Sequence, residues 1–419
     1  MLKRIELLDK YNVPGGRYTY FPFHSKWNNQ LTSDEFKLYL SNESSKVVDV
    51  YIHIPFCHSL CTFCGCNIKI MKSDCDNNIY IDHLLKEWSL YPKNLEISNI
   101  FIGGGTPNFL HANEIARLIK SLPITKDAQI TIEVDPRFIT KEELIQYQQI
   151  GIKRLSIGIQ DFNQDVLINV NREQDNEKII EIINFAKDIK FEHINLDFIY
   201  GLNHQTATTF KQTISMLKEI KTDAVSLYPF AKVPWQNNFQ KAFGTVKDFS
   251  IHELNEIFVE ASFELEKIGF QHVGMGYFSR NNLVNLHRNI MGFTPRKQDI
   301  LIGLGVSSIS SSPIGHLQNE KVYDRYLMQL KEEHTTTIKS HRLSNDELLR
   351  QKFFEKVVCQ KSISNDDLQQ FKTTNTEQII NRLLQDGIIT QNNTGLNVTE
   401  IGIYFLKTIL QTFDPYFNI

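Results

Sequence analysis

A repeating alternation of short apolar segments and helix-like stretches constrains this 419-residue chain more than any other feature. Each apolar segment predicts a strand, and apolar residues at helical spacing occupy the stretches between them. Strands that alternate with helices form parallel sheets. The predicted strands span 47–55, 97–105, 128–136, 153–160, 193–201 and 223–230. Because no break separates these six units, they predict an α/β fold with a partial (β/α)6, TIM-like barrel.

Small or polar residues end nearly every one of these predicted strands. They are His53 and then Cys57, Gly103 to Thr106, Glu133, Gln160, Asp197 and Ala231. Parallel α/β sheets and barrels place their active sites at the carboxyl ends of their strands. The sequence therefore predicts one large site at that edge of the barrel.

The segments on either side of the repeat predict additional parts. Residues 1–46 are polar and irregular, with an aromatic run at 18–23, and are expected to form an arm over the site. Residues 47–250 form the predicted barrel, and 251–343 are expected to supply a barrel extension and a lid segment. Residues 344–419 predict a separate, mainly helical, winged-helix-like unit, because helices precede a strand–turn–strand pattern. A capping box, Ser344-x-x-Glu347, opens its first helix.

Charge and hydropathy narrow the class of protein. The apolar fraction of 41% and the charged fraction of 22% are those of a globular chain. The net charge is −3, and residues 376–419 carry four acids against two bases, so we expect no nucleic-acid partner. No apolar run reaches the length that spans a bilayer, and the first residues do not resemble a signal peptide. The expectation is a cytoplasmic, soluble protein.

Four of the six cysteines lie within ten residues, as Cys57-x3-Cys61-x2-Cys64-x-Cys66. A structural zinc site usually takes two ligands from each of two knuckles, and no second knuckle follows. A redox dithiol would use Cys61 and Cys64 and leave the others unexplained. An iron–sulfur cluster accepts closely spaced thiolates, because its irons lie apart on one cube. The remaining two, Cys75 and Cys359, are expected to be ordinary thiols.

The spacing of the first three cysteines, directly after a predicted first strand, resembles the radical S-adenosylmethionine (SAM) superfamily. There, three cysteines hold a [4Fe–4S] cluster, and the fourth iron is open to SAM. Longer stretches resemble the family of oxygen-independent coproporphyrinogen III oxidases: 51–67, 103–110, 132–137, 154–174, 195–202, 228–235, 286–289 and 303–310. Cys66 belongs to this resemblance, because haem-trafficking relatives usually lack a fourth cysteine.

The resemblance implies roles for residues of this chain. Cys57, Cys61 and Cys64 would ligate the cluster, and Cys66 would not. The residues implied to contact the first SAM are Tyr51, Gly104, Glu133 and Ile309. A second SAM is implied beside it, at Phe63, Gly105, Thr106, Gln160, Arg172, Asp197 and Ala231. We expect Arg17 and Arg288 to meet substrate carboxylates, and His53 to lie close to the reacting centre.

The implied reaction is the oxidative decarboxylation of two propionate side chains of coproporphyrinogen III. A 5′-deoxyadenosyl radical removes hydrogen from each propionate, and the product is protoporphyrinogen IX. An electron-donor protein such as flavodoxin or ferredoxin is implied, and a monomer is expected. The chemistry belongs to the cofactors, and the protein positions and shields them.

Three segments depart from the family's pattern. The family's PGPRYTSYPTA is PGGRYTYFPFH at 14–24, its GMDHFA is GMGYFS at 274–279, and its GDTD is KQDI at 297–300. These changes are expected where substrate or a lid lies. They keep alternatives open: a related radical SAM methyltransferase or haem-opening enzyme, or a non-catalytic haem carrier.

Overall fold

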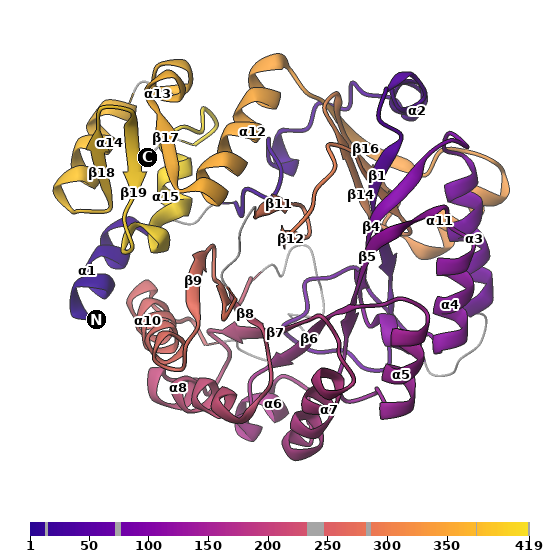
Figure 1. Ribbon diagram of the computed structural model, residues 1–419, viewed down its shortest axis with the longest axis horizontal. Helices are drawn as coiled ribbons and strands as arrows, with labels where there is room; N and C mark the ends of the chain where they lie inside the picture. The colour runs from indigo at the N-terminus through magenta and orange to yellow at the C-terminus, as the bar shows by residue number, and fades with distance from the viewer. Residues whose placement is uncertain (13–15, 72–76, 233–246, 282–285, 374, 418–419) are drawn as a thin grey trace.

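The computed structural model describes residues 1–12, 16–71, 77–232, 247–281, 286–373 and 375–417. Its centre is a curved sheet whose strands form an arc in Figure 1. Six neighbouring parallel strands follow the order of the chain. They are β1 (Val47–Ile54), β4 (Glu96–Gly104), β5 (Ile124–Val134), β6 (Arg154–Gln160), β7 (His193–Tyr200) and β8 (Ala224–Pro229). The predicted partial barrel is confirmed, and only β5 begins several residues earlier than expected.

The two faces of this sheet differ, because successive side chains of a strand point to opposite sides. In β1, Val48, Val50 and Ile52 are buried in the core beneath the surrounding helices, whereas Tyr51 and His53 point to the inner face. The helices lie outside the arc (Figure 1). They are α3 (Asn77–Ser89), α4 (Ala112–Lys120), α5 (Lys141–Gln149), α6 (Gln164–Asn169), α7 (Asn176–Asp188), α8 (Ala207–Ser215) and α10 (Ile251–Lys267).

Residues after the barrel extend the same sheet at both ends. Beside β8 lie β10 (Tyr277–Ser279) and β9 (Gln271–Gly274), both antiparallel. Beside β1 lies the parallel β13 (Leu301–Leu304), followed outward by the antiparallel chain of β14 (Ile309–Ser312), β15 (Gly315–Asn319) and β16 (Thr337–Arg342). Helix α11 (Tyr323–Lys331) and the hairpin of β11 (His287–Asn289) and β12 (Gly292–Thr294) complete this part.

The N-terminal region contains helices where an irregular segment was expected, and that expectation is wrong for α1 (Leu2–Tyr11) and α2 (Ser33–Asn42). A capping box of Thr32 and Glu35 begins α2, and this local signal was overlooked. The segment between them, residues 16–31, is here called the aromatic arm. It buries Tyr18, Phe21 and Trp27, as the expected packing of its aromatic side chains requires.

The C-terminal unit begins with α12 (Asn345–Gln360), and the predicted capping box of Ser344 and Glu347 is present. It continues through β17 (Ser362–Ser364), α13 (Asn365–Phe371), α14 (Thr376–Gln385), β18 (Ile389–Asn392), β19 (Gly395–Val398) and α15 (Leu406–Gln411). Its three strands form one small sheet, as a winged helix requires. Helix α1 lies against this unit, so both chain ends lie on the same side of the molecule (Figure 1).

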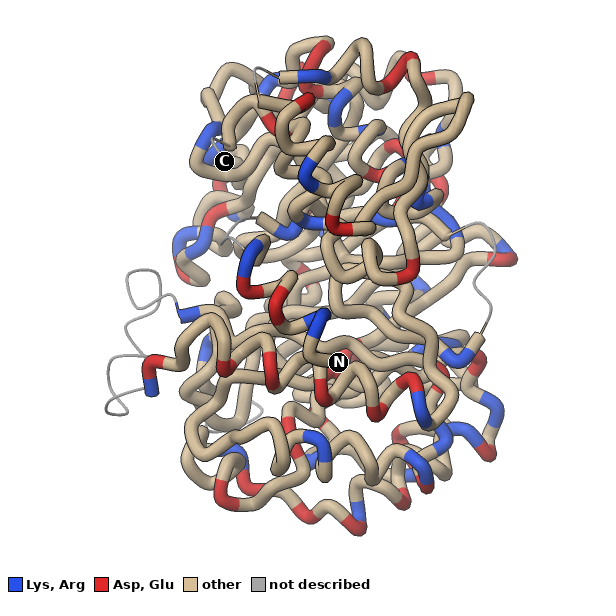
Figure 2. Tube along the Cα trace, turned by 90° about the vertical axis from the view of Figure 1, so that its left-hand side faces the viewer, with Lys and Arg blue, Asp and Glu red and all other residues tan. Residues whose placement is uncertain are grey.

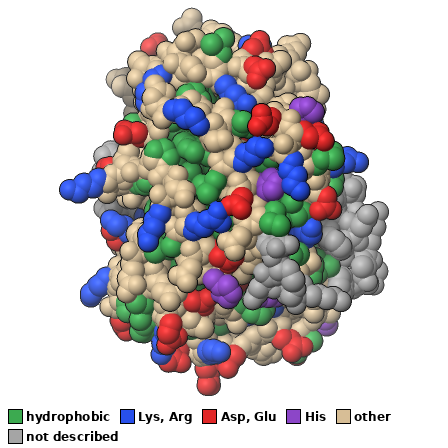
Figure 3. All heavy atoms as spheres, turned by 90° about the vertical axis from the view of Figure 1, so that its right-hand side faces the viewer, with side chains coloured by type: hydrophobic (Ala, Val, Ile, Leu, Met, Phe, Trp, Pro, Cys, Tyr) green, Lys and Arg blue, Asp and Glu red, His purple; other side chains and the backbone are tan. Residues whose placement is uncertain are grey.

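Charged residues of both signs alternate along the trace in Figure 2, and the space-filling view of the side formed by α3, α4 and α11 shows the same mixture (Figure 3). In the described part of the chain, none of the helices combines the length and the apolar character that crossing a bilayer demands.

Candidate active site

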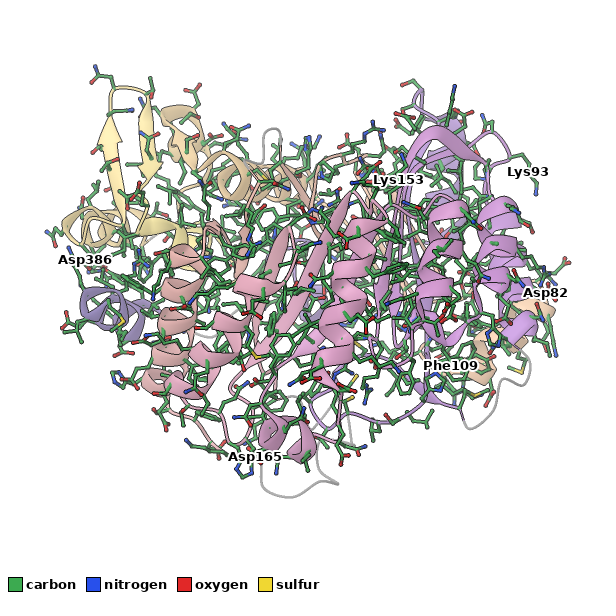
Figure 4. The ribbon with its side chains drawn as sticks, turned by 60° about the horizontal axis from the view of Figure 1, so that its bottom comes forward. Asp82, Lys93, Phe109, Lys153, Asp165 and Asp386 are labelled. Carbon is green, nitrogen blue, oxygen red and sulfur yellow. The ribbon has the colours of Figure 1, made fainter. Side chains whose placement is uncertain are left out.

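The cysteines lie on one loop, residues 56–71, that follows β1 at the carboxyl edge of the barrel, the edge at which its parallel strands end. Two short strands hold the ends of this cysteine loop together, β2 (Phe56–Cys57) and β3 (Lys69–Ile70). Its middle is tied to the segment after α6, because Asn171 donates its Nδ2 hydrogen bond to the carbonyl of Leu60 at 2.6 Å. In Figure 4, Phe109 and Asp165 mark the carboxyl edge, and Lys93 and Lys153 mark the opposite one.

Each of the first two thiols has a donor beside it. The Thr106 hydroxyl lies 3.4 Å from Cys57 Sγ, and Arg172 Nη1 lies 3.6 Å from Cys61 Sγ. Burial raises the pKa of Cys57 to about 12, whereas a hydrogen bond from Cys66 lowers the pKa of Cys64 to about 7 against the effect of burial. Cationic and hydrogen-bonding neighbours stabilise thiolates, the form in which cysteine binds metal.

This donor set fits an iron–sulfur cluster. All four cysteines of the loop are free thiols. Within the described ranges, no three His, Cys, Asp or Glu side chains come close enough together to hold one metal ion, as a mononuclear zinc site requires. A cluster spreads its irons over a cube, so three thiolates that do not converge on one point still reach three of its corners.

A hydrogen-bonded chain links β1 to the cysteine loop. His53 Nε2 lies 2.8 Å from the carbonyl oxygen of Asn67 and must donate to it, because a carbonyl only accepts. His53 Nδ1 is then unprotonated and accepts from the Tyr51 hydroxyl at 3.0 Å. Burial lowers the pKa of His53 to about 4, so the ring is neutral at pH 7. Both ring nitrogens are thus engaged, Nε2 with the cysteine loop and Nδ1 with a neighbouring side chain of β1.

The glycine run after β4 brings backbone against this chain. Gly104 has φ +118°, and a Cβ there would lie 2.8 Å from the His53 ring. Its N–H donates to Glu133 Oε2 at 2.9 Å, and burial raises the pKa of Glu133 to about 7. A Cβ at Gly103 would lie 2.8 Å from the same carboxylate oxygen. The run is required for the close approach of β4, the cysteine loop and Glu133.

A buried ion-pair network lies behind Cys61. Arg172, 5% exposed, donates from Nη1 to Asp135 at 3.0 Å and from Nη2 to the Gly158 carbonyl at 2.6 Å. Arg137 donates to the same carboxylate at 2.7 Å. Burial opposes ionisation of Asp135, but the two guanidinium charges lower its pKa to about 2. Arg172 Nε is buried without a partner among the described residues, an open donor that suits a bound ligand.

Sequence reasoning assigned no role to Asp135, Arg137 or Asn67. The first two belong to the stretch 132–137 that carried the family resemblance, and a charged pair directly after a strand was the available signal. No local pattern marks Asn67, because its contribution is a backbone carbonyl.

Further along the carboxyl edge, Asp197 accepts from Ser156 at 2.7 Å and from Asn195 at 2.9 Å. Burial raises the pKa of Asp197. Gln160 has φ +70°, a left-handed conformation that few non-glycine residues adopt. Such strain persists only where surrounding structure holds it, and it clusters at functional sites.

The two arginines predicted to meet substrate lie in different environments. The Arg17 guanidinium, exposed, lies 5.0 Å from the centre of the Tyr228 ring at the end of β8. Arg288 is buried and donates to the carbonyls of Arg17 and Tyr18 at 2.7 and 2.8 Å. Arg17 is thus available at the carboxyl edge, while both terminal nitrogens of Arg288 hold the aromatic arm.

The remaining predicted contacts lie around the same edge. Phe63 packs with Val166, Val170 and Leu202, and Ala231 lies two residues beyond the end of β8. Ile309 begins β14. The structure therefore gathers the predicted cofactor residues at one edge, from strands on both sides of β1.

The departing segments have separate locations. Gln298, from the KQDI segment, donates its N–H to Asp49 at the start of β1, so this segment lies at the edge opposite the cysteine loop. Lys297, Gln298 and Asp299 also line a cavity that they share with Arg288 and the aromatic arm, and the expectation that this segment lies near substrate or a lid stays a prediction. In the GMGYFS segment, the hydroxyl oxygen of Tyr277 lies 3.3 Å from His193 Nε2. Cys75 is outside the described residues, and burial raises the pKa of Cys359 to about 11.

Comparisons with known proteins identify the family and support the fold. The family model "Radical SAM superfamily" matches residues 51–217. The oxygen-independent coproporphyrinogen III oxidase of Salmonella typhimurium is 32% identical, over 98% of this chain and 95% of its own length, and that of Synechocystis is 29% identical, over 98% and 94%. The solved structure of coproporphyrinogen III oxidase from Escherichia coli, described as a radical SAM enzyme, matches with a TM-score of 0.88 and 30% identity over 98% of each chain. The chain therefore belongs to the family of oxygen-independent coproporphyrinogen III oxidases within the radical SAM superfamily.

Proposed function

We propose that this protein is a radical SAM oxidoreductase that converts two propionate side chains of coproporphyrinogen III to vinyl groups, giving protoporphyrinogen IX without oxygen. Membership of the family and the match to a radical SAM structure support this function. The single observation that carries it is the cysteine loop at the carboxyl edge, fixed by His53 and flanked by Glu133 and the Asp135–Arg172 pair. The cofactors are a [4Fe–4S] cluster and SAM.

When bound, the cofactors supply one electron, a cleaved sulfonium and a hydrogen-abstracting 5′-deoxyadenosyl radical. The protein's part is to hold and shield them. Cys57, Cys61 and Cys64 hold the cluster as thiolates, and Arg172 offsets their negative charge. Glu133, with its Gly104 hydrogen bond, accepts from the ammonium group of SAM, and His53 keeps the loop in register with β1. The aromatic arm and the C-terminal unit keep water from the site.

The remaining residues are assigned to the cofactors and the substrate from their places at the carboxyl edge. We place Tyr51 and Ile309 against the first SAM. A second SAM would meet Phe63, Gly105, Thr106, Gln160, Arg172, Asp197 and Ala231. The Arg172 Nε, which has no partner among the described residues, supports that second site, because an acceptor on a bound ligand would satisfy this buried donor. Arg17 is the residue best exposed to meet a substrate carboxylate.

The decisive experiment is anaerobic incubation with dithionite, SAM and coproporphyrinogen III, followed by mass analysis of tetrapyrrole and nucleoside products. Two losses of carbon dioxide, with 5′-deoxyadenosine, are expected. Formation of S-adenosylhomocysteine with a haem substrate would indicate a methyltransferase instead. No 5′-deoxyadenosine under any condition would indicate a non-catalytic carrier.

Cysteine variants test the cluster separately. Replacing Cys57, Cys61 or Cys64 with Ser is expected to abolish the charge-transfer absorbance of the reconstituted protein and its paramagnetic signal after reduction, because each supplies one of three ligands. Cys66→Ser is expected to retain both signals, and Cys359→Ser is the control for losing a thiol elsewhere. Zinc bound in place of iron would contradict the assignment.

Four finer properties are also proposed: the electron donor, the location, the oligomeric state and the division of the chain. An electron-donor protein such as flavodoxin or ferredoxin would reduce the cluster, and the enzyme would act as a cytoplasmic monomer. The divisions 1–46, 47–250, 251–343 and 344–419 would serve as arm, barrel, extension with lid, and C-terminal unit. Light scattering of the purified protein tests the monomer, and reduction of the cluster by each donor protein tests the partner.

A further inference from the structure

Two lysines lie at the rim of the site without a carboxylate to pair with. Lys339 belongs to β16, and Lys321 follows β15 at the same carboxyl edge. Among the described residues, no Asp or Glu forms an ion pair with either ammonium group. The negative charge of Glu320 attracts the Lys321 ammonium group. The Oε1 atom of Glu320, however, already accepts the backbone N–H groups of Lys321 and Val322 at 2.7 and 2.9 Å. The two lysines and Glu320 together carry a net positive charge at this part of the rim.

The register of the sheet places Lys339 on the inner face. Ile309 pairs with Gln318, and Gln318 pairs with Lys339, so the three residues form one row across β14, β15 and β16. Register partners of antiparallel strands point to the same face. Two strand spacings separate Lys339 from Ile309, roughly 10 Å. Lys339 therefore lies beyond the proposed adenine contact, on the side away from Glu133 and the cysteine loop.

The aromatic arm holds Lys339 in place. Lys339 Nζ donates to the carbonyl of His24 at 2.8 Å and lies 3.4 Å from His24 Nδ1. His24 Nε2 lies 2.8 Å from Gln318 Oε1 and must donate to it, which leaves Nδ1 as an acceptor. Burial, followed by repulsion from both lysines, lowers the pKa of His24 and keeps the ring neutral. An ammonium has three donors, so Lys339 retains one for a ligand.

Lys321 is joined to the reacting end of the site. Its carbonyl accepts from Asn67 Nδ2 at 2.8 Å, and the Asn67 carbonyl accepts from His53. The position of this lysine is therefore set by the same loop that carries the cysteines. The two lysines lie at the same end of neighbouring strands, because Asn319, two residues before Lys321, pairs with Thr337, two residues before Lys339. Burial, together with repulsion from Lys339, lowers the pKa of Lys321.

We propose that Lys339 and Lys321 form a carboxylate site at the rim that receives a propionate of the substrate other than the one being oxidised, with His24 as the positioning residue of Lys339. The proposal rests on the proposed function. Coproporphyrinogen III carries one propionate on each of its four pyrrole rings, so the other three lie away from the reacting centre when one is oxidised. His24 lies in the altered half of the arm, where the family's motif ends in alanine, so this device is a feature of this chain.

The test is equilibrium binding to the cluster-loaded protein, measured with coproporphyrin III, the stable fluorescent form with the same four propionates, and with its uncharged tetraamide. The double variant Lys321→Gln/Lys339→Gln is expected to weaken coproporphyrin III binding about tenfold, because it removes two charge-assisted contacts. Binding of the tetraamide and of SAM is expected to be unchanged. Lys339→Arg keeps the charge and should retain most of the affinity, and His24→Ala should weaken binding of the acid alone.

The matched control is the double variant Lys93→Gln/Lys153→Gln, the same loss of two charges at the opposite edge of the sheet (Figure 4). Equal coproporphyrin III affinity in the double variant and the wild type would overturn the proposal, as would a parallel loss of tetraamide or SAM binding. The proposed function fails separately, if the wild-type protein releases no carbon dioxide from coproporphyrinogen III. Selective loss of acid binding in the double variant supports the carboxylate site in either case.

Discussion

At the scale of single residues, the site is built from side chains that each serve two neighbours. His53 joins Tyr51 to the cysteine loop through its two ring nitrogens. Glu133 accepts a hydrogen bond from the backbone N–H of Gly104. Arg172 connects Asp135, a strand carbonyl and Cys61. Because these side chains are packed against one another, a single methyl group added where they come together is expected to disturb several of the contacts at once.

Gly104→Ala tests this coupling. The new Cβ would lie 2.8 Å from the His53 ring and 2.9 Å from the Ile54 carbonyl, at φ +118°. We expect a loss of about 2–4 kcal/mol in the free energy of unfolding, since overpacking adds to backbone strain. SAM binding to the reconstituted protein, measured by calorimetry, should fall as well.

Gly269→Ala is the control for the backbone alone. Gly269 has φ +92°, and a Cβ there meets nothing within 4 Å. Its expected cost is only about 1 kcal/mol, with SAM binding unchanged. Equal effects of the two substitutions would show that Gly104 matters for its dihedral angles and not for its neighbours.

At the scale of elements, one buried carboxylate joins α3 to the extension of the sheet. Glu87 accepts from the Gly305 N–H at 2.8 Å, Asn319 and Tyr326 at 2.6 Å, and Thr336 at 3.2 Å. These partners come from the end of β13, from β15, from α11 and from the approach to β16. Burial raises the pKa of Glu87 to about 7, although these hydrogen bonds oppose the shift.

The raised pKa predicts a pH dependence of stability. Between the unfolded value near 4.5 and the folded value of about 7, the folded state holds a proton that the unfolded state has released. The contribution of Glu87 is therefore fully present below pH 4.5 and is lost as the pH rises through 7. The wild type should lose roughly 3 kcal/mol more than Glu87→Gln between pH 5 and pH 8 in urea unfolding. Parallel profiles of the two proteins would contradict this.

At the scale of the whole molecule, the N-terminal region connects the C-terminal unit to the barrel. Helix α1 buries Ile5, Leu8 and Tyr11 in the core of the C-terminal unit. The aromatic arm then runs to the inner face of the extended sheet, where His316 meets the Phe21 carbonyl at 3.1 Å. The N-terminal region thus contacts both the core of the C-terminal unit and the extended sheet.

Leu8→Ala and Leu2→Ala form a matched pair for this connection. Leu8 is 5% exposed and Leu2 is 74% exposed, so the same truncation removes buried contacts only at Leu8. Leu8→Ala is expected to cost about 2–5 kcal/mol and to speed proteolysis of the C-terminal unit, and Leu2→Ala less than about 0.5 kcal/mol. Equal proteolysis rates in the two variants would mean that α1 does not secure this unit.

Much of the fold, and part of the candidate site, could be predicted from local patterns in the sequence. Apolar, β-branched runs predict the six parallel strands, the Ser344–Glu347 box predicts the start of α12, and the cysteine spacing predicts the cluster loop, because each is a relation between near neighbours. Only the tertiary structure decided which arginine is exposed at the edge, that Gln298 lies beside Asp49, and that His24 holds Lys339 from 315 residues away. Such contacts arise when packing of the sheet and the arm brings distant segments together, and no local preference of the chain encodes them.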